Sequence, residues 1–359
     1  MTGLVLGIDI GGTGSRVALA ALDASAGRLT DVGADSDTVP DSDKDCIATL
    51  GTLTGPGVSI GADGSNAPQL IRRLVSAARE AWPEHLDSVR GIGIGATGIA
   101  SLSTDIGELA RSFAAEAKAE TAVAIDAVTA HLGALDGRGG AVTVLGTGAI
   151  AIAHPGPDSQ GLLLPTWTRV DGWGHLFGDR GGGAWLGRCA LEVALKCHDG
   201  VDVRGARLLD AATQRFGDPE TWPAQFYTRD DRAGLLAEFA VDLANLVRAG
   251  DPAAAELLAA AGREAARSAI AAGRSAFPTD RSEILGIRHG GDAPLRVALT
   301  GGLRQAGEAL IDEFRVEAMR LSAEASVVEP AGDPLRGALT LASHAADGRV
   351  RPQPGVLWM

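Results

Sequence analysis

The stretch that most constrains the fold of this chain is residues 7–16, GIDIGGTGSR, in which an apolar strand runs into a turn made of glycines. Leu4, Val5 and Leu6 precede the stretch, and the apolar residues 17–22 (VALAAL) follow it. Two apolar segments on either side of a glycine-rich turn are typical of paired strands. The sequence therefore predicts two antiparallel strands, joined by a tight turn, within residues 1–22.

The turn itself has the chemistry of an anion site. Gly11 and Gly12 lack a Cβ atom, so a ligand can approach the backbone, and successive amide groups in such a turn form a concave anion-binding surface. Thr13 adds a hydroxyl donor. Asp9 would repel phosphate unless a hard cation lay between them, and Mg²⁺ is such a cation. We predict a nucleoside triphosphate as ligand, with Mg²⁺ at Asp9; a glycine-rich hairpin without a ligand is the alternative interpretation.

Two better-known phosphate motifs do not fit this stretch. The Walker loop requires GxxxxGK[ST], which the sequence lacks. The dinucleotide fingerprint requires a helix directly after the glycines, whereas an apolar strand is predicted there.

Composition limits the classes of partner and the number of domains. A chain of 359 residues is long for one core and suits two domains. Its net charge of -13 argues against a nucleic-acid partner. No apolar run approaches the ~18 residues of a membrane span, and a basic secretory start is missing, so we expect no membrane partner and a cytoplasmic location. The three cysteines, Cys46, Cys189 and Cys197, lack CxxC spacing and are expected to be reduced.

A second glycine hairpin occurs in residues 141–152, AVTVLGTGAIAI, with its turn at Gly146, Thr147 and Gly148. It repeats the order of strand, glycine turn with threonine, and returning strand. Two such hairpins, facing each other across a cleft, could bind one polyphosphate from both sides. We therefore predict that both hairpins contact the same nucleotide.

Several further segments are predicted around these hairpins. The strand 89–98 (VRGIGIGATG) carries so many glycines that another backbone must pack closely against it. A strand at 295–300 ends at Thr300 and is followed by Gly301 and Gly302. We predict that this segment binds a nucleobase, ribose or α-phosphate. Helices are expected at 68–81, 106–119, 127–135, 184–197, 233–249 and 252–277, a helix opening at 304, a short strand at 121–125 before Asp126, a last strand at 327–328, and loops at 27–45, 52–65 and 351–359.

Six motifs in this order resemble the N-acetylglucosamine kinases of the BadF/BadG/BcrA/BcrD ATPase family, within the actin-like ATPase superfamily. Each motif is weak alone, but together they span most of the chain. They are DIGGTGSR, IDAVTA around Asp126, LGTGAI, GWGHLFGDRGGGAWLG, TGGL and DPLRGALTLA.

The resemblance implies an α/β fold of two actin-like (ribonuclease H-like) domains, each a mixed sheet flanked by helices, with a cleft between them. The domains would be residues 1–125 and residues 126–332, with a helix at about 333–347 returning to the first domain. The resemblance also suggests a homodimer, with helices of the second domain as the contact.

The resemblance further implies roles for individual residues. Asp126 corresponds to the general base for the sugar hydroxyl; a helix cap is its other interpretation. Asp179 would bind sugar hydroxyls, with the backbone of Gly172 and Gly183 lining the pocket; a turn aspartate is the alternative. Aromatic residues after glycine turns are more often core, so we expect Trp173 and Trp185 in the core, and His175 in a structural role.

The expected activity is ATP-dependent phosphorylation of a hydroxyl on an amino sugar (N-acetylglucosamine, glucosamine or a related hexose), with ATP and Mg²⁺ as cofactors. The alternatives are an ATPase that activates a radical acyl-CoA dehydratase or reductase, and a non-catalytic sugar sensor on the same fold.

Three departures from the family pattern leave the sugar unidentified. Arg180 stands in GDRGG where the family usually has GDEGS, which places a base beside the pocket. A pocket asparagine is missing from residues 56–59, and Leu145 stands where a serine is common. Arg180 could attract an anionic group or form a salt bridge.

Overall fold

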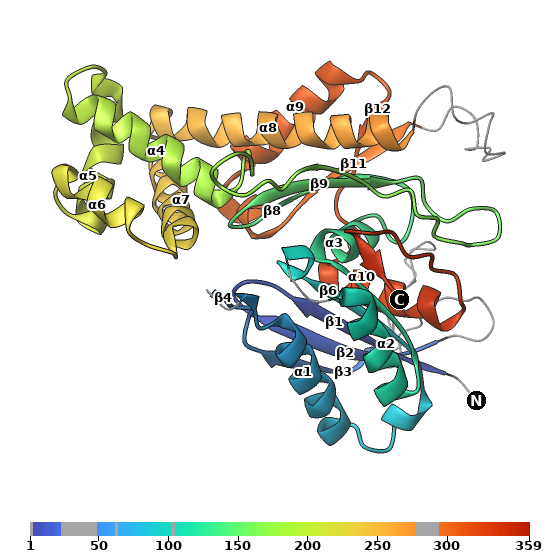
Figure 1. Cartoon of the computed structure of the whole chain (residues 1–359). Helices are drawn as coiled ribbons and strands as arrows, with labels where there is room; N and C mark the ends of the chain where they lie inside the picture. The colour runs from blue at the N-terminus through green and yellow to red at the C-terminus, as the bar shows by residue number, and fades with distance from the viewer. Residues whose placement is uncertain (1–2, 23–48, 62–63, 102–104, 278–293) are drawn as a thin grey trace, which may run out of the picture.

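The computed structural model describes residues 3–22, 49–61, 64–101, 105–277 and 294–359 (Figure 1). Within these ranges, most strands belong to one of two mixed sheets, which Figure 1 shows one above the other with helices around them. The predicted α/β fold of two mixed sheets flanked by helices is therefore confirmed. The loop expected at 27–45 lies entirely outside the described residues, as does Cys46.

The first sheet has the strand order β13-β7-β6-β1-β2-β3. β1 pairs antiparallel with β2, as the opening hairpin predicts, and parallel with β6, which pairs parallel with β7. Its strands are β1 (Leu4–Ile10), β2 (Ser15–Ala21), β3 (Thr49–Gly55), β6 (Val89–Ala96), β7 (Glu120–Ile125) and β13 (Leu357–Trp358).

Alternation along β1 assigns one helix layer to each face of this sheet. Leu6 and Ile8 belong to the cluster that includes Leu74 of α1 (Ala67–Ala81) and Phe113 of α2 (Ile106–Ala117). Val5 packs instead in the cluster formed with α10 (Pro334–Ala346). Odd-numbered residues of β1, which include Asp9, therefore face the α10 side.

The glycines of β6 explain how close α10 can come. A Cβ atom at Gly91 would lie 2.1 Å from the Ala342 carbonyl oxygen, and one at Gly93 would lie 2.1 Å from that of Ala338. Both carbonyls belong to α10. The expectation that another backbone packs tightly against this strand is confirmed.

The helices α3 (Asp126–Ala134) and α10 cross with similar closeness beside the sheet. A Cβ atom at Gly337 of α10 would lie 1.7 Å from the Thr129 carbonyl oxygen, and one at Gly133 would lie 2.1 Å from the Asp333 carbonyl oxygen. α3 also contacts β8 and β9 of the second sheet. This glycine-mediated crossing therefore links the two sheets.

The second sheet has the order β10-β9-β8-β11-β12. The long helix α8 packs on β8, β9 and β10, and α9 packs on α8. Its elements are β8 (Gly140–Leu145), β9 (Ala149–His154), β10 (Thr168–Asp171), α4 (Gly183–His198), α5 (Ala206–Phe216), α6 (Trp222–Tyr227), α7 (Arg232–Arg248), α8 (Pro252–Ala276), β11 (Leu295–Thr300), α9 (Glu308–Leu321) and β12 (Ala325–Val327).

Three predictions of local structure are wrong. Part of the loop expected at 52–65 is strand β3, which pairs antiparallel with β2 because its backbone completes the sheet edge. The helix expected to open at 304 begins at Glu308, after a 3-10 turn over Gly302–Ala306. The tail expected on the surface instead supplies β13, in which Leu357 is fully buried and pairs with Ala124.

Two buried histidines lie where the sheets meet. His131 of α3 and His154 of β9 both contact the ring of Trp167, at centroid distances of 5.1 and 4.2 Å. Nε2 of each ring bonds to a carbonyl oxygen, and His154 Nδ1 accepts the Gly156 amide at 2.9 Å. Burial lowers the pKa of His131 to about 3 and that of His154 to about 4. Burial likewise lowers the pKa of His344 of α10 to about 4.

We expect stability to fall as the pH decreases from 6.5 to about 4. In this window the unfolded chain takes up protons on these histidines and the folded chain does not, so each costs roughly 1 kcal/mol per pH unit. Urea unfolding at pH 7, 6 and 5 measures the slope, and His154→Gln should reduce it. A free energy of unfolding that is constant between pH 7 and 5 would contradict the expectation.

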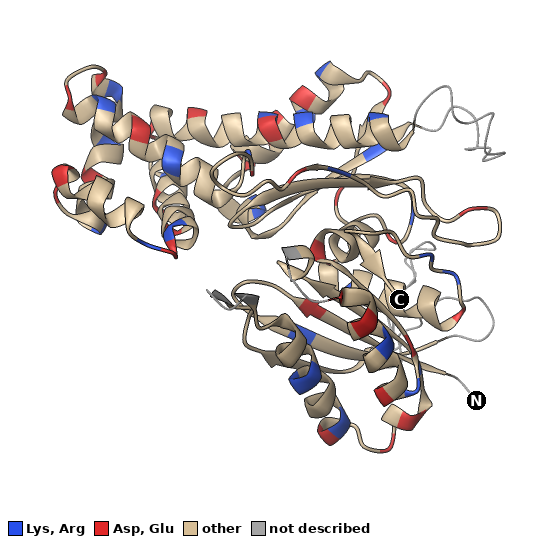
Figure 2. Cartoon of the chain, viewed as in Figure 1, with Lys and Arg blue, Asp and Glu red and all other residues tan. Residues whose placement is uncertain are grey.

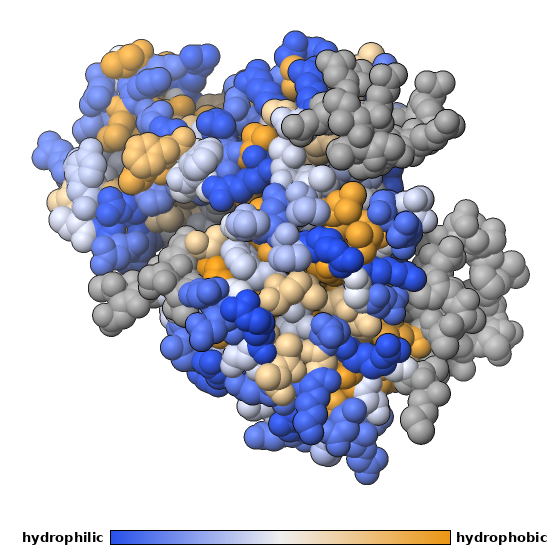
Figure 3. Space-filling view, turned by 45° about the vertical axis from the view of Figure 1, so that its right-hand side comes forward, coloured by the Kyte–Doolittle hydropathy of each residue, from blue (hydrophilic) through white to orange (hydrophobic). Residues whose placement is uncertain are grey.

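The surface is polar and mixed in charge. Lys, Arg, Asp and Glu alternate over the helices (Figure 2), and the coloured part of the face in Figure 3 is mostly hydrophilic with small, separate hydrophobic areas. Among the described residues, we find no helix with the length and apolar character of a membrane span.

Candidate functional site

The first part of the candidate site lies at one edge of the first sheet. Ile10, Ala96 and Ile125 are neighbours in register on the parallel strands β1, β6 and β7. The residues that follow them are the first hairpin turn, Thr97 and Asp126. Loops after the carboxyl ends of parallel strands are where open α/β sheets bind ligands. The fold thus brings Asp126 to the same edge as the first glycine hairpin.

Asp126 is partly accessible, and its carboxylate is held by neighbouring groups. Burial raises the pKa of the Asp126 carboxyl, and the nearby charge of Asp9 raises this pKa further. Hydrogen bonds from the Thr97 hydroxyl and the Ala127 amide oppose the rise. Asp126 is the first residue of α3, and Ile125 occupies the cap position. Asp126 is therefore not the N-cap residue of α3, although its carboxylate accepts from the Ala127 amide in the first turn of that helix.

Asp9 forms an ion pair that the sequence did not reveal. Its Oδ2 accepts from Arg16 at 2.8 Å, and the same guanidinium also binds Asp333, whose side chain caps α10. Burial raises the pKa of Asp9 despite the Arg16 contact. Arg16 therefore links the edge of β1 to the start of α10.

The first hairpin turn is closed by its own backbone and leaves its tip open. The Gly11 amide donates to the Gly14 carbonyl at 2.9 Å, and the Gly11 carbonyl accepts from the Val58 amide at 3.0 Å. Gly12 and Thr13 are exposed. The tip therefore presents backbone and the threonine hydroxyl to solvent, as an anion-binding turn requires.

The second hairpin turn is buttressed by the start of α4. The Gly183 amide donates to the Gly146 carbonyl at 2.9 Å, and the Ala184 amide donates to the Thr147 carbonyl at 2.8 Å. Gly146 and Thr147 remain exposed, and Gly148 is half-buried. Two amides at the N-terminus of α4 are thus used to position this turn.

The TGG segment lies directly beside the second hairpin. β11 pairs parallel with β8, with Thr300 opposite Val144. Gly301 has φ +102°, and a Cβ atom there would lie 2.2 Å from the Leu145 carbonyl oxygen. Only glycine fits such a position. Two of the segments predicted to bind nucleotide are therefore neighbours at one sheet edge, namely residues 146–148 and residues 300–302.

At three of the predicted sites, the packing of the protein itself leaves room for a side chain where the sequence has glycine. A Cβ atom added at Gly12, Gly146 or Gly302 would meet no atom within 4 Å. By contrast, a Cβ atom added at Gly148 would lie 2.5 Å from Asp179 Oδ2, and Gly172 has φ +74°. Open space beside backbone in both hairpins and the TGG segment is what close approach of a ligand would need.

Asp179 is held by a second carboxylate that sequence reasoning missed. Asp171 is 2% exposed; its Oδ1 accepts from the Asp179 amide at 2.8 Å and its Oδ2 from the Arg180 amide at 3.0 Å. The Arg180 guanidinium lies 3.4 Å from the same Oδ2 and 3.8 Å from Glu264. Of the two roles considered for Arg180, the structure supports the salt bridge. The sequence offered one signal for Asp171, an acid directly before a glycine turn.

Asp179 itself is half-buried beside the second hairpin. Its Oδ1 accepts from the Gly174 amide at 3.0 Å, and burial raises the pKa of its carboxyl. Its φ of 54° lies in the left-handed region. Asp179 thus lies beside the second sheet, whereas Asp126 lies at the edge of the first sheet.

We expect Asp171→Asn to lower the free energy of unfolding by about 2 kcal/mol, because one amide donor would face the new NH₂ group. Asp158→Asn is the matched control. Asp158 also accepts two amides, from Gln160 and Leu162, but with a single oxygen that asparagine retains. Urea unfolding of both variants measures the difference, and equal stabilities would contradict the role given to Asp171.

The aromatic residues of this loop depart from expectation. Trp173 is 67% exposed, so its assignment to the core is wrong. Its ring instead stacks against the Arg169 guanidinium, 5.0 Å from the centroid. Trp185 is half-buried against the core of the second sheet.

The donors near Asp9 suit a cation that keeps most of its water. Among the described residues, no group of three or more His, Cys, Asp or Glu side chains could hold a metal ion. Mg²⁺ is often bound by one or two carboxylates together with water and substrate phosphates. Asp9 fits that pattern, and its charge is close enough to Asp126 to raise the pKa of that carboxyl.

Comparison with known proteins gives the following. The sequence profile of the BadF/BadG/BcrA/BcrD ATPase family matches residues 6–342. No curated protein sequence matches the chain. Among solved structures, a candidate N-acetylglucosamine kinase from Chromobacterium violaceum is 24% identical with a TM-score of 0.60, covering 95% of this chain and 99% of that one.

Two further structures share the fold. A candidate N-acetylglucosamine kinase from Porphyromonas gingivalis is 16% identical with a TM-score of 0.58, covering 96% of this chain and 99% of that one. A ROK-family glucokinase from Streptomyces griseus, solved with glucose and AMPPNP, is 19% identical with a TM-score of 0.55, and the match covers 96% of this chain and 100% of that one. The fold shared with these structures and the profile match over nearly the whole chain agree with the motif order. The chain belongs to the BadF/BadG/BcrA/BcrD ATPase family.

Proposed function

We propose that this protein is an ATP-dependent sugar kinase that phosphorylates a hydroxyl of an amino sugar, namely N-acetylglucosamine, glucosamine or a related hexose. The observation that carries the proposal is the position of Asp126 at the sheet edge beside the first glycine hairpin. The fold shared with a glucokinase and with two candidate N-acetylglucosamine kinases supports it. Because the reaction consumes ATP, we further propose that the protein acts in the cytoplasm.

In the proposed reaction, the nucleotide would lie between two domains. The first domain comprises residues 1–125 and the helix near 333–347, and the second comprises residues 126–332. The exposed turns at 11–13 and 146–148 would bind its phosphates, and residues 300–302 its adenosine end or α-phosphate. Phosphoryl transfer depends mainly on positioning and charge neutralisation. Asp9 would hold Mg²⁺, which neutralises phosphate charge when bound. The paired Arg16 fixes the Asp9 carboxylate in place.

Asp126 would accept the proton of the sugar hydroxyl as its oxygen attacks the γ-phosphorus. The new oxygen–phosphorus bond forms while the bond between the γ-phosphorus and the bridging oxygen breaks, and ADP leaves with that oxygen. A carboxylate whose pKa is raised by burial is a stronger base than one in water. The Thr97 hydroxyl orients this carboxylate.

The sugar would be bound from the second domain by Asp179, with the backbone of Gly172 and Gly183. A half-buried carboxylate rejects analogues that lack the matching hydroxyl, since its lone pairs would be unpaired. Asp171 would act through Asp179 as a positioning residue.

The test is turnover by the purified protein with ATP, Mg²⁺ and a panel of hexoses, read as ADP release and as sugar phosphate by ³¹P NMR. We expect N-acetylglucosamine or glucosamine to be phosphorylated faster than glucose. If ADP release does not depend on any sugar, the kinase proposal fails. If glucose is preferred, only the amino-sugar assignment fails.

The alternative of an ATPase that activates a radical enzyme has less support. Such a protein needs cysteine thiolates for its iron–sulfur cluster. Burial raises the pKa of Cys189 to about 11, which disfavours its thiolate. The alternative of a non-catalytic sensor predicts sugar binding without turnover, which the same assay distinguishes.

We also propose a homodimer formed through helices of the second domain. Val316 and Met319, one turn apart on α9, are 56% and 48% exposed and could belong to such a contact. Sedimentation velocity of the protein and of Val316→Glu tests this assembly, and a monomer at all concentrations would contradict it.

A further inference from the structure

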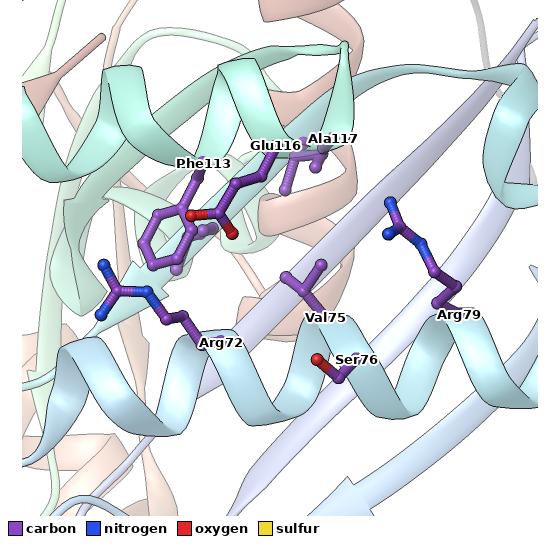
Figure 4. A pocket seen from close by; sticks show the side chains of 9 residues that line it. Arg72, Val75, Ser76, Arg79, Phe113, Glu116 and Ala117 are labelled. Atoms are coloured by element: carbon purple, nitrogen blue, oxygen red, sulfur yellow. The ribbon is translucent and has the colours of Figure 1, made fainter.

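A pocket lies between α1 and α2, on the face of the first sheet opposite to α10. It encloses about 150 Å³ and is open to solvent at its rim. Figure 4 shows side chains of α1 and of α2 extending into the space between the two helices. Its lining residues are Arg72, Val75, Ser76, Arg79, Ile92, Ile94, Phe113, Glu116 and Ala117. Neither Asp9, Asp126 nor either hairpin belongs to it.

The pocket is built from two facing helix stripes. On α1 the lining residues are spaced i, i+3, i+4 and i+7, which places them on one face of the helix. On α2 they are spaced i, i+3 and i+4. Arg72 and Arg79 therefore stand about two helical turns, or roughly 10 Å, apart along the rim.

The floor of the pocket is apolar. Ile92 and Ile94 of β6 lie beneath it and are almost fully buried, as is Phe113 on the α2 side. Val75 and Ala117 are half-buried between the helices. A cavity of about 150 Å³ lined by such residues is large enough for benzene. The apolar part of an occupant is thus limited to about one six-membered ring.

The rim of the pocket carries a net positive charge. The Arg72 guanidinium lies over the Phe113 ring, 5.5 Å from its centroid. Within the described chain, neither Arg72 nor Arg79 forms an ion pair. Glu116 supplies one negative charge and accepts from the Ser112 hydroxyl at 3.2 Å. Two arginines and one glutamate leave a charge that a single anionic group would balance.

The charge of α1 is unusual for this chain. The helix contains three arginines and one glutamate, while the whole chain has a net charge of -13. Figure 2 shows the basic residues of α1 in blue along the helix. Basic side chains gathered above an apolar floor match a ligand that is anionic at one end and apolar at the other.

We propose that the α1–α2 pocket binds a small monoanion with an apolar body, chemically a carboxylate on an aromatic or other six-membered ring. The ring would lie between Val75 and Ala117, above the buried floor of Ile92, Ile94 and Phe113. The carboxylate would pair with Arg72 and Arg79. A phosphate ester fits less well, because its second charge has no partner and the floor offers it no donor. This site is separate from the proposed kinase site.

Benzoate is the probe, titrated calorimetrically into the full chain at fixed pH and ionic strength without nucleotide or sugar. We expect roughly millimolar affinity, typical for a ligand of this size. Arg72→Gln and Arg79→Gln should each weaken binding at least tenfold. Ala117→Leu, which fills the pocket and leaves its charge unchanged, should abolish it. Arg73→Gln is the matched control, since Arg73 is exposed on the same helix but does not line the pocket.

Benzamide tests the contribution of the ring without the negative charge, and inorganic phosphate tests negative charge without the ring. Both should bind at least tenfold more weakly than benzoate. The proposal is overturned if benzoate does not bind, if benzamide or phosphate binds equally well, or if the Arg72, Arg79 and Ala117 variants bind as the wild type does. Thermal unfolding of each variant confirms that it is folded. Because the readout is binding, it is independent of whether the protein proves to be a kinase.

Discussion

Asp126→Asn should reduce kcat for sugar phosphorylation by about 10²–10⁴-fold, because the asparagine keeps the volume and the Thr97 hydrogen bond but cannot accept a proton. Sugar and nucleotide binding should be retained, since the amide can still contact a hydroxyl. Steady-state kinetics measures kcat, and calorimetry with the preferred sugar measures binding.

The same substitution should raise the melting temperature at pH 7. The pKa of Asp126 is raised in the folded state, so its charged form destabilises the fold at any pH well above that value. This penalty disappears as the pH falls below the ordinary aspartate pKa. Removal of the charge should therefore stabilise the protein while it lowers kcat, as is common for catalytic groups.

Asp105→Asn is the control for Asp126→Asn. Asp105 caps α2 by accepting from the Glu108 amide at 3.1 Å, and asparagine caps equally well. We expect kcat and stability close to those of the wild type. If Asp126→Asn retained more than a tenth of the wild-type kcat, another group would have to be the base.

Gly337→Ala should destabilise the protein by about 3 kcal/mol or more, because its methyl group would lie 1.7 Å from the Thr129 carbonyl oxygen and force α3 and α10 apart. Activity should fall as well, since Asp126 begins α3 and Asp333 caps α10. Urea unfolding measures the change in free energy.

Gly234→Ala provides the matched comparison within α7. A Cβ atom there meets no atom within 4 Å, so alanine should be neutral or stabilise the helix by up to about 1 kcal/mol. A Gly337→Ala variant as stable as this one would show that the two helices are not so closely packed in solution.

The sequence predicted the parts of the fold that local patterns determine. The glycine turn at 11–13 between apolar runs identified the β1–β2 hairpin, and the glycines of β6 predicted the close approach of a second backbone. The long Ala/Leu stretches identified α7 and α8. Each of these signals depends on neighbours within a few residues.

What the sequence could not predict depends on contacts between distant residues. β3 consists largely of glycine and threonine, and β13 has only two residues, so neither has a clear local strand pattern; each pairs with the edge of the first sheet. The support of Asp126 by Thr97, of Asp9 by Arg16, and of Asp179 by Asp171 follows from strand register and loop conformation. Trp173 was misassigned because a cation can cover an aromatic ring without burying it.

Strand β13 and helix α10 also bear on how the protein is made. The first sheet begins at Leu4, yet α10 covers one of its faces and Leu357 borders β7, and the Val356 carbonyl accepts from the Ile125 amide, next to Asp126, at 3.0 Å. During synthesis, one apolar face of the opening strands therefore stays uncovered until more than three hundred further residues have been translated. Such a delay leaves the nascent chain vulnerable to aggregation, and we expect it to depend on chaperones during synthesis.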